Sequence, residues 1–295
     1  MTGNNEHREA LDLSVVIPAY HEEQVIFDVV SGVQSVLADQ GLDYEVIVVD
    51  DGSGDRTAQE AGRAGAHVIS HAYNIGNGAA VKTGIRAARG EIIIMMDGDG
   101  QHNPEDIPGM LEMMDTYDMV VGSRTKGSDT DVHRDLGNGI YNFLATYICN
   151  RKIKDLTSGF RAFKAEIGRE FLHLLPNTFS YPTTITLAVA RSGYPFAYYP
   201  IQVARRKGQS KINLVRDGLR FFLIIFKVAT LFSPLKVFIP ASLGLFSLGF
   251  GYGLYKVLVL GTRYGPTSAL LMTMSGLVFL IGLVSEQLTQ LRYEK

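Results

Sequence analysis

The chain has 295 residues, of which 46% are hydrophobic and 20% are charged, and its formal net charge is −2. Its one cysteine, Cys149, excludes a disulfide framework and a cysteine-based metal site. The charge is unevenly distributed, because residues 1–131 hold 23 acidic and 8 basic side chains, whereas residues 132–295 hold 7 and 20. This favours a metal-using first part and a second part that faces phosphates or an anionic membrane. Basic residues alternate with long apolar runs, so binding to nucleic acid is the weaker interpretation.

The first part of the chain alternates strands and helices at short spacing. Residues 1–12 are polar, and we expect a flexible tail without a cleaved signal peptide. Five strand–helix alternations predict an α/β fold with a doubly wound, mostly parallel sheet. The predicted strands are Leu13–Ile17, Tyr44–Val49, His67–Ser70, Ile92–Met96 and Asp118–Gly122, and the predicted helices run from about Glu22 to Ala38, from about Asp55, from Ala79 to Ala88 and from Pro104 to Thr116.

Acidic residues follow the apolar strand Ile92–Met96. Asp97 and Asp99 are one residue apart on a glycine-flanked turn, where both can face one divalent cation. The alternative is a polar turn that caps the helix starting near Asn103. Pro18–Glu22 and Asp50–Asp51 also follow strands, and ligands of such sheets bind at the carboxyl ends of the strands. Helix capping alone poorly explains three such strand ends, so we expect a nucleotide site at this edge.

The region 123–211 is less regular. We expect a helix from Leu136 to Cys149, another from Pro182 to Arg191, and a strand from Phe196 to Val203. The segment Asp155–Arg161 is predicted to be a turn with exposed hydrogen-bond donors. The basic run Arg205–Lys211 is either a solvated loop or, because an apolar region follows it, a surface that meets lipid phosphates.

The last part of the chain carries two long uncharged runs. Neither the stretch between Lys236 and Lys256 nor the stretch between Arg263 and Glu286 holds a charge, and about 20 apolar residues span a bilayer. A membrane hairpin is expected, with a soluble helical hairpin as the alternative. Lysines and arginines near both ends predict cytoplasmic ends and a cytoplasmic catalytic part. Gly244, Gly249, Gly251 and Gly253 suit close helix packing, which makes a homo-oligomer plausible.

Leu214–Leu231 mixes cationic and apolar residues, and it is either an interfacial helix or an ordinary amphipathic core helix. The predicted organisation is a tail (1–12), a catalytic domain (13–211), a juxtamembrane helix (212–233) and a transmembrane hairpin (234–291, with spans at about 237–260 and 267–289).

With these motifs the chain resembles the family 2 glycosyltransferases of GT-A type, and within them the polyprenyl-phosphate glycosyltransferases. The resemblance implies a Rossmann-like GT-A domain followed by an interfacial helix and a two-helix transmembrane hairpin. It implies that the nucleotide contacts Pro18, Ala19, Tyr20, Glu22, Asp50, Asp51, Lys82, Asp97 and Gly98.

The resemblance also assigns the chemistry. Asp97, Asp99 and Gln101 would hold Mg²⁺ or Mn²⁺, and Asp99, Arg124 and Arg134 would be the catalytic residues. The acceptor phosphate would meet Arg134, Ser158, Arg205, Arg206 and Lys211.

The chain departs from its relatives in informative ways. His21 stands where asparagine is commoner, and the late acidic pair of hydroxyl-acceptor relatives is missing. A hydroxyl acceptor needs a general base, whereas a lipid phosphate is already an anion. The chain contains no tryptophan, which excludes the Q-x-x-R-W signature of processive polysaccharide synthases.

The resemblance, together with the missing acidic pair, implies an inverting sugar transfer from a UDP- or GDP-hexose to undecaprenyl or dolichyl phosphate at the cytoplasmic membrane face. One alternative is transfer to another membrane acceptor, such as a diacylglycerol hydroxyl, with Asp155 as the base. A second alternative is a membrane protein that binds nucleotide sugars without turnover.

Overall fold

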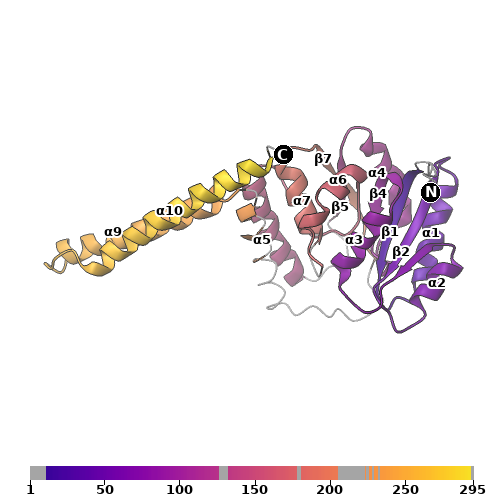
Figure 1. The fold of residues 1–295 in the computed structure, drawn as a ribbon, viewed down its shortest axis with the longest axis horizontal. Coiled ribbons are helices and arrows are strands. Elements are labelled where there is room, and N and C mark those ends of the chain that lie inside the picture. Colours follow the sequence, from indigo (N-terminus) through magenta and orange to yellow (C-terminus); the bar gives the residue numbers. More distant parts are fainter. Residues whose placement is uncertain are drawn as a thin grey trace, which may run out of the picture. The chain divides into compact units, whose positions relative to one another are not determined.

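The computed structural model describes residues 11–125, 132–177, 181–204 and 233–293, together with 223, 226, 227 and 229–231. The chain divides into two compact units, residues 1–221 and 222–295 (Figure 1).

The first unit is built on a seven-stranded sheet with the strand order β3-β2-β1-β4-β6-β5-β7. Strand β6 runs antiparallel to both of its neighbours, and the other strand pairs are parallel. The predicted mostly parallel α/β sheet is confirmed, although β6 was not anticipated. The strands are β1 (Leu11–Ala19), β2 (Tyr44–Asp50), β3 (His67–Ser70), β4 (Gly90–Met95), β5 (Met119–Arg124), β6 (Arg161–Lys164) and β7 (Phe196–Ile201).

Seven helices lie in the described residues of this unit. The first helix begins at Ile26 rather than near Glu22. Residues 22–25 form a turn in which the backbone carbonyl of Glu22 accepts hydrogen bonds from the Val25 and Ile26 amides. Residues 11 and 12, which were predicted to belong to the tail, are the first two residues of β1. The helices are α1 (Ile26–Ala38), α2 (Thr57–Arg63), α3 (Asn77–Ala87), α4 (Ile107–Met114), α5 (Val132–Cys149), α6 (Ala165–Glu170) and α7 (Tyr181–Arg191), with 3-10 turns η1 (Pro104–Asp106) and η2 (Leu172–Leu174).

Helices cover both faces of the sheet. On one face, Val15 and Ile17 of β1 join a buried cluster that includes Val30 of α1 and Met110 of α4. On the other face, Val16 packs so closely on Gly84 of α3 that a side chain at that position would collide with it. Burial on both faces explains why the central strands are continuous apolar runs in the sequence.

The second unit contains the helices α9 (Leu235–Leu258) and α10 (Pro266–Tyr293), drawn orange to yellow in Figure 1. They pack against each other, and the Ser275 hydroxyl donates a 2.9 Å hydrogen bond to the Ser242 carbonyl. By length and composition both helices can cross a membrane, over Leu235–Leu258 and Pro266–Leu291. Most of the predicted interfacial helix, Leu214–Leu231, lies outside the described residues.

Candidate active site

Three strand ends meet at one edge of the sheet. Strands β2, β1 and β4 are adjacent and parallel, with Ala19 opposite Asp50 and Val16 opposite Met95. The backbone of Gly98 lies against Pro18, since a Cβ atom on Gly98 would be 3.2 Å from the Pro18 carbonyl oxygen. The predicted convergence of these strand ends is confirmed.

The turn after β1 is tied to the turn after β2. The backbone amide of His21 donates to the Ser53 hydroxyl at 2.9 Å, and that of Glu22 donates to the Thr57 hydroxyl at 2.9 Å. His21 has a φ of 58°, in the left-handed region where asparagine, aspartate and histidine are enriched among residues other than glycine. The Tyr20 ring packs on the His21 ring at 4.2 Å and stays 42% exposed, which leaves an aromatic surface at the edge of the sheet.

Asp50 and Asp51 are buried, and their carboxylates form hydrogen bonds to other residues of the chain. Asp50 accepts the backbone amide of Ser53 at 3.2 Å. In the structure Asp51 holds the loop before α3 in place through hydrogen bonds. Its predicted contact with a nucleotide stays a prediction. Its carboxylate oxygens lie within hydrogen-bonding distance of His71 Nδ1 (2.7 Å), Asn74 Nδ2 (2.9 Å), Ile75 N (3.1 Å) and Gly76 N (2.8 Å).

The turn after β4 offers oxygen ligands. The Asp97 side chain is 36% exposed, and an Asp99 carboxylate oxygen accepts the Gln101 backbone amide at 3.1 Å. The Gln101 side-chain nitrogen donates to the Ala204 carbonyl at 3.0 Å, which leaves its oxygen as the remaining acceptor. No group of three or more His, Cys, Asp or Glu gathers among the residues that the structure describes. Two carboxylates and an amide fit Mg²⁺ or Mn²⁺, because such cations take few protein ligands and add substrate phosphates.

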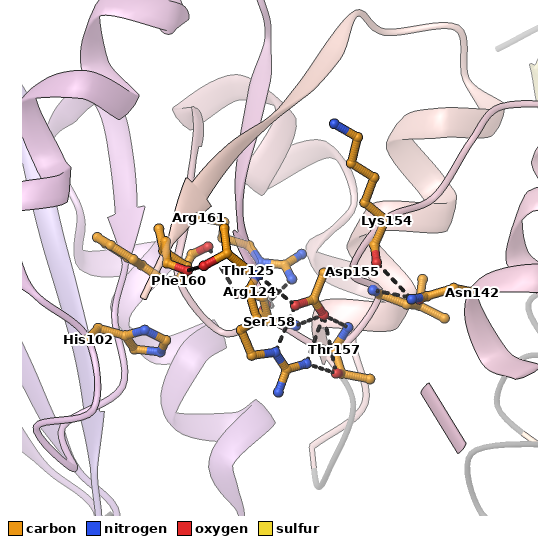
Figure 2. A network of polar contacts seen from close by, with 12 residues as sticks. His102, Arg124, Thr125, Asn142, Lys154, Asp155, Thr157, Ser158, Phe160 and Arg161 are labelled. Atoms are coloured by element: carbon orange, nitrogen blue, oxygen red, sulfur yellow. Dashed lines mark hydrogen bonds and ion pairs between the residues drawn. The ribbon is translucent and has the colours of Figure 1, made fainter. Parts of the chain in front are cut away.

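Arg124, at the end of β5, forms a two-pronged ion pair with Asp155 (Figure 2). Arg124 Nε and Nη2 each lie 2.8 Å from an Asp155 oxygen, and Nη2 also donates to the Thr157 hydroxyl at 2.6 Å. The amides of Thr157 and Ser158 donate to the same carboxylate at 3.1 and 3.2 Å. Burial alone would raise the pKa of Asp155, but the hydrogen bonds and charge of Arg124 outweigh it and hold that pKa below its ordinary value.

The prediction that Asp155–Arg161 is an exposed turn is wrong. Asp155, Ser158 and Arg161 are only 6%, 4% and 0% exposed. Arg161 begins β6 between β4 and β5, which draws the preceding turn into the interior. Ser158 is buried, and its predicted contact with an acceptor phosphate stays a prediction.

Lys82 lies on α3 and reaches a different segment. Its ammonium donates to the Leu175 carbonyl at 3.2 Å and to the side-chain oxygen of Asn177. Burial, with a smaller effect from the charge of Arg86, lowers the pKa of Lys82. In this structure Lys82 ties α3 to the 175–177 segment, and its predicted role beside the diphosphate stays a prediction.

Four predicted acceptor residues cannot be placed. Arg134 belongs to α5, but its side chain lies outside the described part of the chain, as do Arg205, Arg206 and Lys211.

Three residues near the site were not anticipated, the partly buried His102 and the buried Tyr181 and Arg161. His102 Nε2 lies 3.4 Å from an Asp97 oxygen. The Tyr181 hydroxyl donates to the Gly159 carbonyl at 2.9 Å, and Arg161 is fully buried beside Tyr181. His102 follows the D-x-D turn and was visible in the sequence, whereas no local pattern connects residues 159, 161 and 181 to it.

Comparison with known families agrees with this geometry. The model described as Glycosyl transferase family 2 matches residues 14–172, more than half of the chain. The chain belongs to glycosyl transferase family 2. A second model, described as GtrB C-terminal hairpin, matches residues 233–291 of this family 2 chain. The resemblance inferred from the motifs is therefore confirmed, and the protein is a glycosyltransferase.

Curated relatives of this family 2 enzyme extend over most of its length. Glycosyltransferase AglJ of Haloferax volcanii is 31% identical over 82% of this chain and 80% of its own. Dolichyl-phosphate hexose transferase of the same organism is 32% identical over 74% and 93%. Undecaprenyl-phosphate 4-deoxy-4-formamido-L-arabinose transferase of Klebsiella pneumoniae is 28% identical over 86% and 78%.

Solved structures share the fold of the family 2 enzyme. Glucosyl-3-phosphoglycerate synthase from Mycobacterium tuberculosis, in complex with Mn²⁺, uridine diphosphate and phosphoglyceric acid, matches with a TM-score of 0.61 at 20% identity. The match covers 74% of this chain and 78% of that one. At this identity the likeness establishes the fold alone.

Proposed function

We propose that the protein transfers a hexose, with inversion, from a UDP- or GDP-sugar to a polyprenyl phosphate at the cytoplasmic face of a membrane. Relatives named for dolichyl and undecaprenyl phosphate align over most of the chain, and a hairpin long enough to span a membrane follows the catalytic unit. The proposed organisation keeps the catalytic domain at 13–211, the juxtamembrane helix at 212–233 and the hairpin at 234–291.

The observation that carries the choice of acceptor is the state of Asp155. A hydroxyl acceptor requires a base, and Asp155 was the carboxylate available for that role. Its oxygens instead accept Arg124 twice and the amides of Thr157 and Ser158, and its pKa is depressed. A carboxylate held in this way is a poor proton acceptor. A lipid phosphate needs no base, so a phosphate acceptor fits the site better than a diacylglycerol hydroxyl.

In the proposed reaction an oxygen of the acceptor phosphate attacks the anomeric carbon, and the nucleoside diphosphate leaves from the opposite side. Asp97, Asp99 and Gln101 would hold Mg²⁺ or Mn²⁺, which supplies Lewis-acid stabilisation of the leaving diphosphate. Arg124, oriented by Asp155, would add positive charge beside the same group. Pro18, Gly98 and the exposed Tyr20 ring would bind the nucleotide.

On the acceptor side, Arg134, Arg205, Arg206 and Lys211 would bind the phosphate of the lipid, because guanidinium and ammonium groups pair with phosphate oxygens. This part of the proposal rests on the sequence and the resemblance.

A transfer assay tests the proposal. Detergent-purified full-length protein is incubated with labelled UDP- and GDP-sugars, with polyprenyl phosphate or diacylglycerol, and with Mn²⁺, Mg²⁺ or EDTA. We expect a metal-dependent product that partitions with polyprenyl phosphate, and the effective donor identifies the sugar. A product on diacylglycerol would contradict the acceptor, and nucleotide-sugar binding without product on either lipid would favour the non-catalytic alternative.

A further inference from the structure

The turn 158–160 presses its backbone against the carboxylate of Asp97. A Cβ atom added to Gly159 would lie 2.8 Å from both Cγ and Oδ1 of Asp97, which is closer than real Cβ contacts come. Only a hydrogen atom therefore fits between the Gly159 backbone and the carboxylate, so the Asp97 side chain packs directly against this backbone.

Two fully buried side chains fix the backbone of the turn 158–160 in place. Tyr181, the first residue of α7, donates its hydroxyl to the Gly159 carbonyl at 2.9 Å. The guanidinium of Arg161 donates to the Ser158 carbonyl and, at 3.0 Å, to the Pro182 carbonyl. Two successive carbonyls of the turn are thus fixed to α7 and β6, so the position of Gly159 is set by the interior of the unit.

His102 also approaches the Asp97 carboxylate, at the Oδ2 atom that lies nearest to Gly159. Its Nε2 lies 3.4 Å from an Asp97 oxygen. The His102 ring packs on the ring of Phe160, in the turn 158–160, with 5.1 Å between the ring centroids, and Figure 2 shows these two residues. The Asp97 carboxylate is consequently contacted by both Gly159 and His102, although its side chain stays 36% exposed.

We propose that Gly159 and Tyr181 are positioning residues of the metal site, which set the orientation of the Asp97 carboxylate from a segment more than sixty positions along the chain. The inference rests on the proposed function, in which Asp97 is a metal ligand. Carboxylate ligands bind metal well only when outer groups fix their direction, and removing such groups weakens metal affinity about 10- to 100-fold.

Electron paramagnetic resonance of Mn²⁺ tests this without an activity assay. Full-length protein in detergent is titrated with Mn²⁺ in the presence of UDP and, separately, of GDP. For Gly159→Ala the Mn²⁺ dissociation constant should rise about tenfold or more, because the new methyl group displaces the carboxylate. For Tyr181→Phe, which removes one oxygen atom, it should rise about threefold or more.

Tyr194→Phe is the matched control, because it removes a tyrosine hydroxyl that is hydrogen-bonded to Glu170 at 2.6 Å. The Mn²⁺ affinity of this variant should stay within about twofold of the wild type, because Tyr194 is not hydrogen-bonded to any proposed metal ligand. Nucleotide affinity in EDTA should be unchanged in all three variants, which separates a positioning role from collapse of the site.

The outcomes are distinguishable. Wild-type protein that binds no Mn²⁺ with either nucleotide would refute the metal assignment of the proposed function itself. If the wild type binds Mn²⁺ and both Tyr181→Phe and Gly159→Ala bind it with the same affinity, only the positioning roles would be overturned. Equal loss of nucleotide affinity in EDTA would also overturn them. If Gly159→Ala fails to fold, as judged by thermal unfolding, Tyr181→Phe decides.

Discussion

The carboxylate of Asp155 is saturated by donors that fix Arg124 in place. Two guanidinium nitrogens and two backbone amides share its oxygens within 3.2 Å. Paired, bidentate contacts of this kind define the orientation of the arginine plane as well as its position. Asp155 is thereby suited to positioning Arg124 and poorly suited to removing a proton.

Asp155→Asn should lower transfer to polyprenyl phosphate about tenfold or more, because an amide cannot hold Arg124 at both oxygens. Asp118→Asn, which breaks the 2.6 Å pair of Asp118 with the half-exposed Lys164, is the matched control and should retain activity. Initial rates with the donor found in the transfer assay measure the effect. Full activity of Asp155→Asn would show that Arg124 does not need this partner.

The same substitution has a pH signature. The folded-state pKa of Asp155 is depressed, so its stabilisation is present above the ordinary carboxyl pKa and is lost as the pH falls through the lower, folded value. Breaking a buried pair costs about 3 kcal/mol of unfolding free energy at neutral pH. The stability difference between wild type and Asp155→Asn should shrink below about pH 4. Thermal unfolding of the full chain at neutral and acidic pH measures it, and a constant difference would contradict the pairing.

Asp99→Ala should abolish metal-dependent transfer without unfolding the protein, because the carboxylate lies on a partly exposed turn after β4 and its proposed partner is the metal. Glu105→Ala, an exposed acid on η1, is the control and should keep most of its activity. Activity with Mn²⁺ and the unfolding temperature are measured together. A folded Asp99→Ala variant with most of its activity would refute the metal role of Asp99.

Among the elements, β6 reshapes the site most. It contains only four residues and pairs with two strands that precede it in the chain, Ile92↔Lys164 on β4 and Val121↔Arg161 on β5 among them. Its antiparallel insertion buries the turn 155–160 between the D-x-D strand and the Arg124 strand. A four-residue strand has no distinctive periodicity, and its partners lie outside any local window.

In the hairpin, the glycines of α9 differ in what they face. A side chain on Gly249 would press on Leu271 and Ser268 of α10, and one on Gly253 would press on Tyr264. Gly244 and Gly251 have open space around them. Glu286 of α10 accepts the Leu235 amide at 3.4 Å and so serves the start of α9 within the same hairpin.

Gly249→Leu should therefore destabilise the hairpin by about 1–3 kcal/mol through overpacking. Gly251→Leu adds the same side chain two residues away on the open side and should be close to neutral. Thermal unfolding of the two variants in the same detergent compares them. Equal destabilisation would show that Gly251 also faces a partner, such as a second copy of the chain.

On the scale of the whole molecule, the chain combines a family 2 glycosyltransferase unit with a pair of helices long enough to cross a membrane. Lys227 and Lys236 lie before and at the start of the first span, and Arg292 and Lys295 follow the second, whereas Lys256 and Arg263 lie near the loop between the spans. The excess of basic residues at the ends favours cytoplasmic ends. That orientation would place the catalytic unit where nucleotide sugars are made.

Cysteine labelling tests the orientation, because the native Cys149 is buried and provides an unreactive background. A membrane-impermeant maleimide added to intact cells should label Thr262→Cys, in the exposed loop between α9 and α10. Gln40→Cys, exposed after α1, should react only after the membrane is opened. The reverse pattern would place the catalytic unit outside.

Local patterns in the sequence determined the alternating strands and helices, the carboxylates at three strand ends and the two apolar runs. These features depend on residues close together in the chain, because periodicity and strand-end position are local properties. The family resemblance rested on the same motifs.

Only the tertiary structure decided how the site is supported. Arg124 and Asp155 are 31 positions apart, and Tyr181 and Gly159 are 22 apart. Contacts between distant segments likewise decide whether Ser158 is buried, whether the Asp51 carboxylate is hydrogen-bonded within the protein, and which glycines of α9 face α10. Each is decided by how the elements pack, and packing is a property of the folded chain that no short stretch of sequence contains.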